Sequence, residues 1–222
     1  MPGTASPPRE RLSREAVIAG ALALADREGL AAVTIRRLAG EAGVTPMALY
    51  WHVKDKDELL DGMGQQLFAE VALPPSHGEP WDVELRAVLT ALLVALRRHP
   101  AAAGLAMTTV LTSDAGLVVA ERALGLLCAA GLGAQEAAET GQLLLASMVT
   151  MVTAQPGDPG AEETAAARRH KRALLGALEP GRFPYVVRLA EHLTHCDTGE
   201  YDGRGVDVLV SGIVARVAAA RA

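Results

Sequence analysis

The chain has 222 residues and a net charge of −5, and half of its residues are hydrophobic although only 3% are aromatic. This composition indicates an ordered, helix-rich protein with a core of Ala, Leu, Val and Met, and it excludes an intrinsically disordered chain. The net acidity excludes a uniformly basic nucleic-acid coat, so any nucleic-acid site has to be local. Cys128 and Cys196 lie far apart without CxxC spacing, which argues against a disulfide scaffold or a structural zinc site and fits a reducing cytoplasm.

No targeting or membrane-spanning segment is predicted. Residues 1–12 are rich in Pro, Gly and Ser, which is typical of a flexible leader, and they lack the apolar stretch of a signal peptide. The longest uncharged stretch, 140–157, contains several polar residues, whereas a membrane span needs about 20 mostly apolar residues. We therefore expect a buried helix there and no membrane partner.

The first predicted helices are short and sharply bounded. Ser13 is a good N-cap for the first helix, and Gly29 is expected to end it. Thr34 opens a second helix, which Gly43 breaks. These signals predict two helices separated by a tight turn.

A third and a fourth helix follow. Thr45 with Pro46 predicts a helix start with proline at the first helical position, where its missing N–H does no harm. Asp55 and Glu58 stand three apart like a capping box and open a fourth helix, which the linker 73–80 ends. Residues 34–52 therefore have the lengths of a helix-turn-helix, which places its second helix in the major groove of DNA.

Beyond the linker, every periodic segment is long and helical, and no alternating strand pattern appears. The predicted helices are 81–98, 100–111, 114–130, 134–154, 161–178, 184–195 and 206–221. Loops are predicted at 155–163 and 196–205, which concentrate Gly, Pro and Asp. The segments 139–154 and 206–221 are apolar around their circumference, so each needs partners on more than one side. The predicted fold class is all-α, with a small N-terminal helical domain joined through the fourth helix to a larger helical domain.

Charge is distributed unevenly along the chain. Residues 9–56 carry eight Lys and Arg against six Asp and Glu, so this part is net positive while the remainder is net negative. The difference is small, but it fits one DNA-facing end on an acidic body.

The string LAGEAGVTPMALYWHVKDKDELLDGM, residues 38–63, resembles the DNA-binding segment of the TetR family of transcriptional repressors. Further on, LRRHP and YDGRGVDVLVSGI are similar to the C-terminal domain of the tetracycline-repressor branch. The resemblance implies a DNA-binding domain over 13–72 and a ligand-binding and dimerisation domain over 81–222. It also implies a homodimer that binds double-stranded operator DNA and a small-molecule inducer that releases it. With one helix-turn-helix per subunit, the operator is expected to be palindromic.

The resemblance assigns DNA contacts position by position. Arg36 matches a base-contacting arginine, whose planar fork fits guanine, although a solvated helix arginine is the alternative. Tyr50 and Lys56 match phosphate-contacting residues, and Lys56 also lies at a helix N-terminus, where amides attract an anion. Trp51 and His52 could touch the backbone or serve as ordinary wall residues. The start of the recognition helix is formed by Thr45, Pro46, Met47 and Ala48. Pro46 stands where the tetracycline-repressor branch has a glutamine, so a different operator is expected.

The resemblance also shows what the ligand site lacks. Ala72, Ala106 and Ala123 stand where the tetracycline repressors have two histidines and a glutamine for the drug and its metal. We therefore expect no tetracycline–magnesium site, no cofactor and an inducer that is largely hydrophobic. Ordinary core packing is the alternative for each predicted lining residue: Met63, Leu67, Leu89, Leu93, Met107, Leu127 and Met148, with Gln142 or Glu139 as an orienting polar group.

Two groups of residues could indicate a function other than regulation. His192, His195, Cys196 and Asp197 carry suitable metal donors, but exposed histidines at helix ends are commoner than ligands. Ser147 and Ser211 lack His and Asp partners in a recognised order, so a hydrolytic triad is unsupported.

A helical-bundle enzyme or small-molecule carrier without operator binding is the alternative function, and a purely structural dimer is the third possibility. The dimer interface is predicted to form through 139–154 and 206–221.

Overall fold

A computed structural model of the chain describes residues 12–154, 162–194 and 197–221, and every regular element in these ranges is helical. The described ranges exclude His195 and Cys196, and they include only residue 12 of the predicted leader 1–12. The N-terminal elements are α1 (Arg14–Glu28), a 3-10 turn η1 (Leu30–Ala32), α2 (Ile35–Ala42), α3 (Pro46–Tyr50) and α4 (Lys56–Ala69). The body contains α5 (Trp81–Arg98), η2 (Ala103–Leu105), α6 (Ala106–Thr109), α7 (Asp114–Ala129), α8 (Ala134–Thr153), α9 (Glu162–Gly176), α10 (Pro184–Arg188) and α11 (Thr198–Arg221). The all-α fold class is confirmed.

Side-chain caps set the N-terminal helix boundaries as the sequence predicts. The Ser13 hydroxyl accepts a hydrogen bond from the Ala16 amide, and Asp55 accepts one from Glu58 at 2.8 Å. The hydroxyls of Thr34 and Thr45 cap α2 and α3 in the same way. Each cap satisfies an amide that has no partner within its helix, so local sequence is sufficient to place these starts.

The two predicted helix stops are glycines with positive φ. Gly29 after α1 has φ 85°, and Gly43 after α2 is left-handed with φ 65°. Residues that carry a side chain rarely adopt a positive φ, which explains why glycine stands at these two turns.

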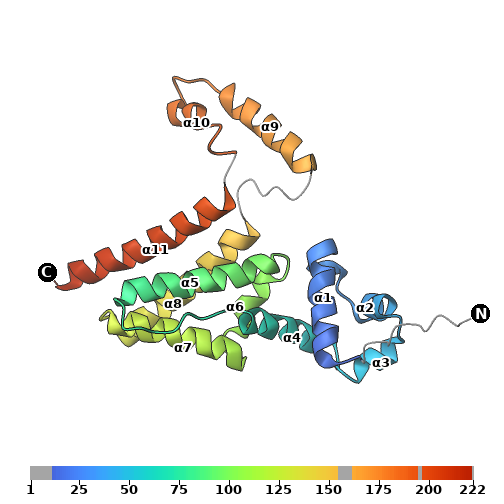
Figure 1. Cartoon of the computed structure of the whole chain (residues 1–222). Coiled ribbons are helices and arrows are strands. Elements are labelled where there is room, and N and C mark those ends of the chain that lie inside the picture. The colour runs from blue at the N-terminus through green and yellow to red at the C-terminus, as the bar shows by residue number, and fades with distance from the viewer. Residues whose placement is uncertain (1–11, 155–161, 195–196, 222) are drawn as a thin grey trace, which may run out of the picture.

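The body is built around α5, which packs against α7, α8 and α11 (Figure 1). Helix α4 joins the two parts of the protein, since it packs against α1 on one side and against α6 and α7 on the other. Two glycines allow this close approach. A Cβ at Gly62 would lie 2.8 Å from Ile18 of α1, and one at Gly64 would lie 2.5 Å from the side chain of Thr109 of α6. Helix α4 is thus in close contact with both the N-terminal helices and the body.

The prediction of a loop at 196–205 followed by a helix from residue 206 is wrong. Helix α11 already begins at Thr198, with Asp197 accepting a hydrogen bond from the Glu200 amide. Asp202 then forms a half-buried ion pair with Arg97 of α5, with contacts of 2.6 and 2.9 Å. This tertiary pairing outweighs the low helix propensity of the glycines in the segment.

Two other predicted helices are shorter than expected. The segment 100–111 forms the turn η2 followed by the single turn α6, and of the described residues 184–194 only Pro184–Arg188 is α-helical. Helices α9 and α10 pack against each other and project from the rest of the body (Figure 1).

No single described helix is both long and apolar enough to cross a membrane. The segment Ala103–Thr109 and α7 together meet the length and composition of a span, but they are bent by 81°. Both segments pack against α4 and α8, and α7 also packs against α5.

Candidate DNA-binding surface and ligand cavity

A small core holds α3 against α2, which in turn packs against α1. Leu38 and Ala39 of α2 and Leu49 of α3 are buried, and Val53 after α3 joins them. The turn between the helices is closed by a hydrogen bond from the Val44 amide to the Ala39 carbonyl at 3.0 Å. This core fixes the outward face of α3.

Large apolar side chains cover that outward face. Met47, Tyr50 and Trp51 are 68%, 48% and 84% exposed. A tryptophan is normally largely buried, so its exposure beside two other large side chains indicates a binding surface. Ala48 and His52 are half-buried at the edge of this face.

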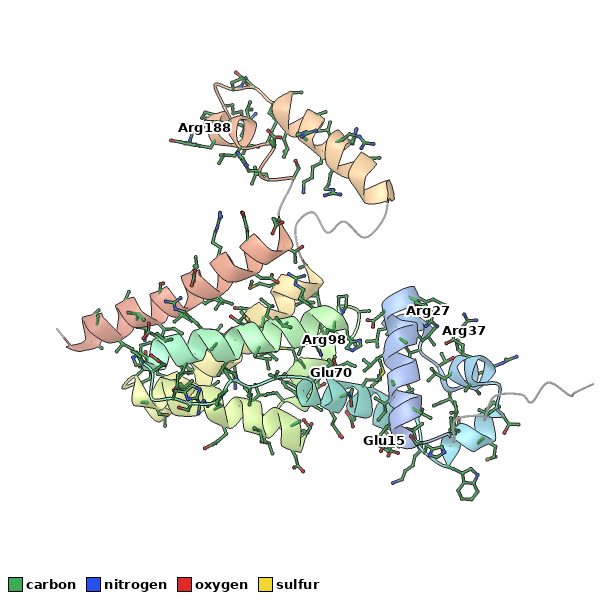
Figure 2. All side chains as sticks on the ribbon, in the orientation of Figure 1. Glu15, Arg27, Arg37, Glu70, Arg98 and Arg188 are labelled. Carbon is green, nitrogen blue, oxygen red and sulfur yellow. The ribbon has the colours of Figure 1, made fainter. Side chains whose placement is uncertain are left out.

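The cations at this end of the protein fall into two groups. Arg27 donates two hydrogen bonds to Glu41 at 2.8 Å, and Arg37 pairs with Glu28 at 2.6 Å (Figure 2). The hydrogen bond that Arg37 donates to Glu28 raises the pKa of this guanidinium above its usual value.

Arg36 and Lys56 belong to the second group. Both are exposed, and neither forms an ion pair within the described ranges. Lys56 is the first residue of α4, directly after its N-cap Asp55. These two cations are therefore available to an anionic partner, whereas Arg27 and Arg37 hold α1 and α2 together.

The body contains an apolar cavity of about 150 Å³ between α4, α5, α7 and α8. Gln142 of α8 is the one polar side chain in its lining, and no charged side chain reaches it. The lining residues are Phe68, Val88, Leu89, Leu92, Val110, Leu111, Val119, Ala120, Ala123, Leu124, Ala138, Gly141, Gln142, Leu144 and Leu145. Such a wall favours a neutral apolar molecule, with Gln142 able to orient one polar group.

The structure brings only part of the predicted ligand set to this cavity. Gln142 and Leu89 line it, whereas five predicted residues are buried in the core away from its wall: Met63, Leu67, Leu93, Leu127 and Met148. Met107 lies on α6 with its side chain 44% exposed, and Glu139 is exposed on α8. Whether any of them contacts a ligand stays a prediction.

The sequence analysis misses several residues of the cavity wall and predicts their neighbours in the chain as lining residues instead. Phe68 lines the cavity beside the predicted Leu67, and Leu92 lines it beside Leu93. Phe68 is one of only two phenylalanines in the chain, and this scarcity was the available signal.

The three alanines that replace the tetracycline-repressor residues occupy different environments. Ala123 lines the cavity, Ala106 is fully buried at the start of α6, and Ala72 is exposed after α4. Within the part of the chain that the structure describes, no three His, Cys, Asp or Glu side chains could share a metal ion. The candidate metal-donor group at His192 includes His195 and Cys196, which lie outside the described residues.

The segments predicted to form the dimer interface expose apolar side chains. Leu143 of α8 is 68% exposed and Val208 of α11 is 67% exposed. Both line an open groove of about 500 Å³ together with Ala146, Met151 and Leu209. An exposed apolar groove of this kind is typical of an interaction surface.

Comparisons with known proteins identify relatives of both parts of the chain. Residues 17–63 match the family model described as bacterial regulatory proteins, tetR family, and residues 73–217 match that of the tetracyclin repressor-like C-terminal domain. The chain is 30% identical over 213 residues to an HTH-type transcriptional regulator of Saccharopolyspora erythraea, covering 92% of this chain and 85% of that protein. It is 42% identical over 79 residues to the class D tetracycline repressor of Escherichia coli, which covers 34% of this chain and 36% of the repressor. The structure of the Streptomyces coelicolor TetR family protein ActR in complex with actinorhodin is similar with a TM-score of 0.78 and 29% identity, over 92% of this chain and 96% of ActR.

Proposed function

The chain belongs to the TetR family of transcriptional regulators, and we propose that it binds a palindromic operator as a homodimer and is released by a small, largely hydrophobic molecule. Operator binding places its site of action with the DNA in the cytoplasm. A helical-bundle enzyme or carrier does not require the exposed apolar face of α3. The family match and that face therefore favour the regulator.

The observation that carries the DNA-binding proposal is the exposed face formed by Met47, Tyr50 and Trp51. The same domain carries the exposed cations Arg36 and Lys56, which form no ion pair with any residue that the structure describes. Lys56 and the Tyr50 hydroxyl act on phosphates, which fixes the position of α3 in the groove without reading sequence. Arg36 reads a guanine by two parallel hydrogen bonds. Met47 contacts a thymine methyl group.

The proposed dimer joins the apolar faces of α8 and α11 with their symmetry mates. Burial of Leu143 and Val208 in such an interface removes from water the most exposed apolar side chains of these two helices. A two-fold axis then presents two α3 helices to one face of DNA, roughly 34 Å apart.

The proposed inducer occupies the apolar cavity. A neutral molecule is favoured because an unpaired charge would be desolvated there without a partner, and one hydrogen-bonding group could meet Gln142. The complex of the similar protein ActR with actinorhodin supports a small-molecule site in this kind of body. Magnesium is not required, because Ala106 and Ala123 offer no ligand atoms for it.

Helix α4 connects the two sites. Phe68 near its C-terminal end lines the cavity, and Lys56 at its first turn belongs to the DNA surface. The close contact of Gly64 with Thr109 ties the middle of α4 to α6, which directly precedes the wall residues Val110 and Leu111. A ligand that displaces this wall moves α4 and changes the separation of the recognition helices, to the extent that it prefers one arrangement over the other.

Selection of bound sequences from a random duplex library by the purified protein tests the DNA-binding part. The proposal predicts an enriched palindrome with two half-sites about one helical turn apart. Recovery of unenriched sequence, or of a single half-site without a symmetric partner, would contradict it. Light scattering on the same sample at micromolar concentration reports the dimer.

A further inference from the structure

At the junction between α1 and the body, His99 lies between two carboxylates from different helices. Its Nδ1 is 2.7 Å from Oδ2 of Asp26 in α1, and its Nε2 is 3.5 Å from Oε1 of Glu70, which follows α4. Arg98, the last residue of α5, lies 3.6 Å from the other oxygen of Glu70 (Figure 2). Because a carboxylate only accepts, the short contact requires the hydrogen to be on Nδ1.

The His99–Asp26 contact is partly shielded from water. The two side chains are 19% and 27% exposed, whereas the ion pairs inside the helix-turn-helix involve more exposed arginines. A shielded charged hydrogen bond is stronger than one on an open surface. Among the described ion pairs, it is the one that connects the segment before residue 54 to the body after residue 80.

Two close contacts between α1 and α4 lie in the first half of α1. Arg14 lies 3.9 Å from Glu58, and Ile18 packs on Gly62. Asp26 lies two turns beyond Ile18, or about 12 Å along the helix at 1.5 Å per residue. These contacts hold the first half of α1, and the His99–Asp26 contact adds a direct connection to the body near the last turn of α1.

We propose that the His99–Asp26 contact fixes the orientation of α1, and with it the helix-turn-helix, relative to the body, and thereby sets the half-site spacing that the dimer accepts. His99 is a positioning residue in this account, since it does not reach DNA. The inference rests on the proposed function, because spacing is defined only for a dimer on an operator.

The same contact gives the cavity a second route to the DNA-binding end. The chain from His99 runs through Ala102 and Ala103, both fully buried, and through η2 and α6 to the cavity wall at Val110 and Leu111. This short packed segment transmits a displacement of the wall to the junction. Loss of the contact therefore loosens the spacing without touching α3.

The test measures affinity of the full-length protein for three duplexes: the selected operator, the same operator with one base pair inserted between the half-sites, and a single half-site. One inserted pair moves and rotates one half-site relative to the other, and wild-type protein is expected to discriminate against it by at least about tenfold. For His99→Ala and Asp26→Ala, this preference falls to about twofold or less while half-site affinity stays within about twofold of wild type. His99→Asn is expected to retain the preference, because its amide can donate from the position of Nδ1.

Arg86→Ala is the matched control, since Arg86 also lies on α5 and pairs with Asp207 at 2.6 Å without touching α1. It is expected to leave the spacing profile unchanged. A wild-type spacing profile in both alanine variants would overturn the inference, as would an equal loss of half-site and full-site affinity, which indicates damage to the helix-turn-helix itself. Wild-type protein without any sequence preference would instead remove the proposed function, and this inference with it.

Discussion

A substitution that fills the cavity tests both whether the cavity is empty and whether it binds a ligand. Ala123→Leu adds three carbon atoms to the wall of a cavity of about 150 Å³. These atoms need on the order of 90 Å³ if each takes about the volume of one water molecule, so the cavity can hold them. At about 0.8 kcal/mol per buried methylene the upper bound is about 2.4 kcal/mol, and strain of the inserted side chain lowers this gain. We expect Ala123→Leu to raise the free energy of unfolding by about 1 to 2 kcal/mol, or the melting temperature by about 2 to 8 °C.

The assay pairs urea unfolding at a fixed protein concentration with binding of a neutral apolar dye, N-phenyl-1-naphthylamine. The filled variant should bind the dye at least about tenfold more weakly than wild type and should keep its operator affinity. Ala129→Leu is the control, because it makes the same change at an exposed position of the same helix. A filled variant that is destabilised by several kcal/mol, or one that binds the dye as wild type does, would refute the assignment of this cavity.

Three further substitutions test other parts of the account. Lys56→Ala should weaken binding to all DNA sequences about equally and reduce the salt slope by about one unit, whereas Arg36→Ala should relax base preference; operator binding unchanged by both would contradict the assigned contacts. Val208→Asp should give a folded monomer in light scattering, because the side chain is exposed within one chain, and a persistent dimer would exclude the α11 interface. Gly64→Ala should lower the stability measured in urea by about 1 to 3 kcal/mol, since its Cβ meets buried Thr109 at 2.5 Å, and Thr109→Ala in the same chain should recover part of the loss.

Local signals were sufficient for the DNA-binding end. Ser13 and Asp55 cap the helices that follow them, and Gly43 ends α2 with a positive φ. Each of these features depends on neighbours within four residues, so the sequence contains the whole cause.

Distant contacts explain what the sequence could not predict. The early start of α11 depends on the pairing of Asp202 with Arg97, and the junction depends on His99 meeting Asp26, 73 residues earlier in the chain. Helical periodicity identified the inward face of α4, but it cannot tell the core residue Leu67 from its neighbour Phe68 at the cavity wall. That distinction depends on how four helices meet.

The central claim is that a molecule held in the apolar cavity removes the protein from its operator. The most direct measurement is an operator-release titration with compounds that raise the melting temperature of wild-type protein but not that of Ala123→Leu, since such compounds bind at the cavity. The account predicts that at least one of them releases wild-type protein from a labelled operator, fails to release Ala123→Leu, and has the same midpoint in magnesium and in chelator. Compounds that meet the melting criterion yet leave operator binding unchanged, or release that requires magnesium, would contradict it.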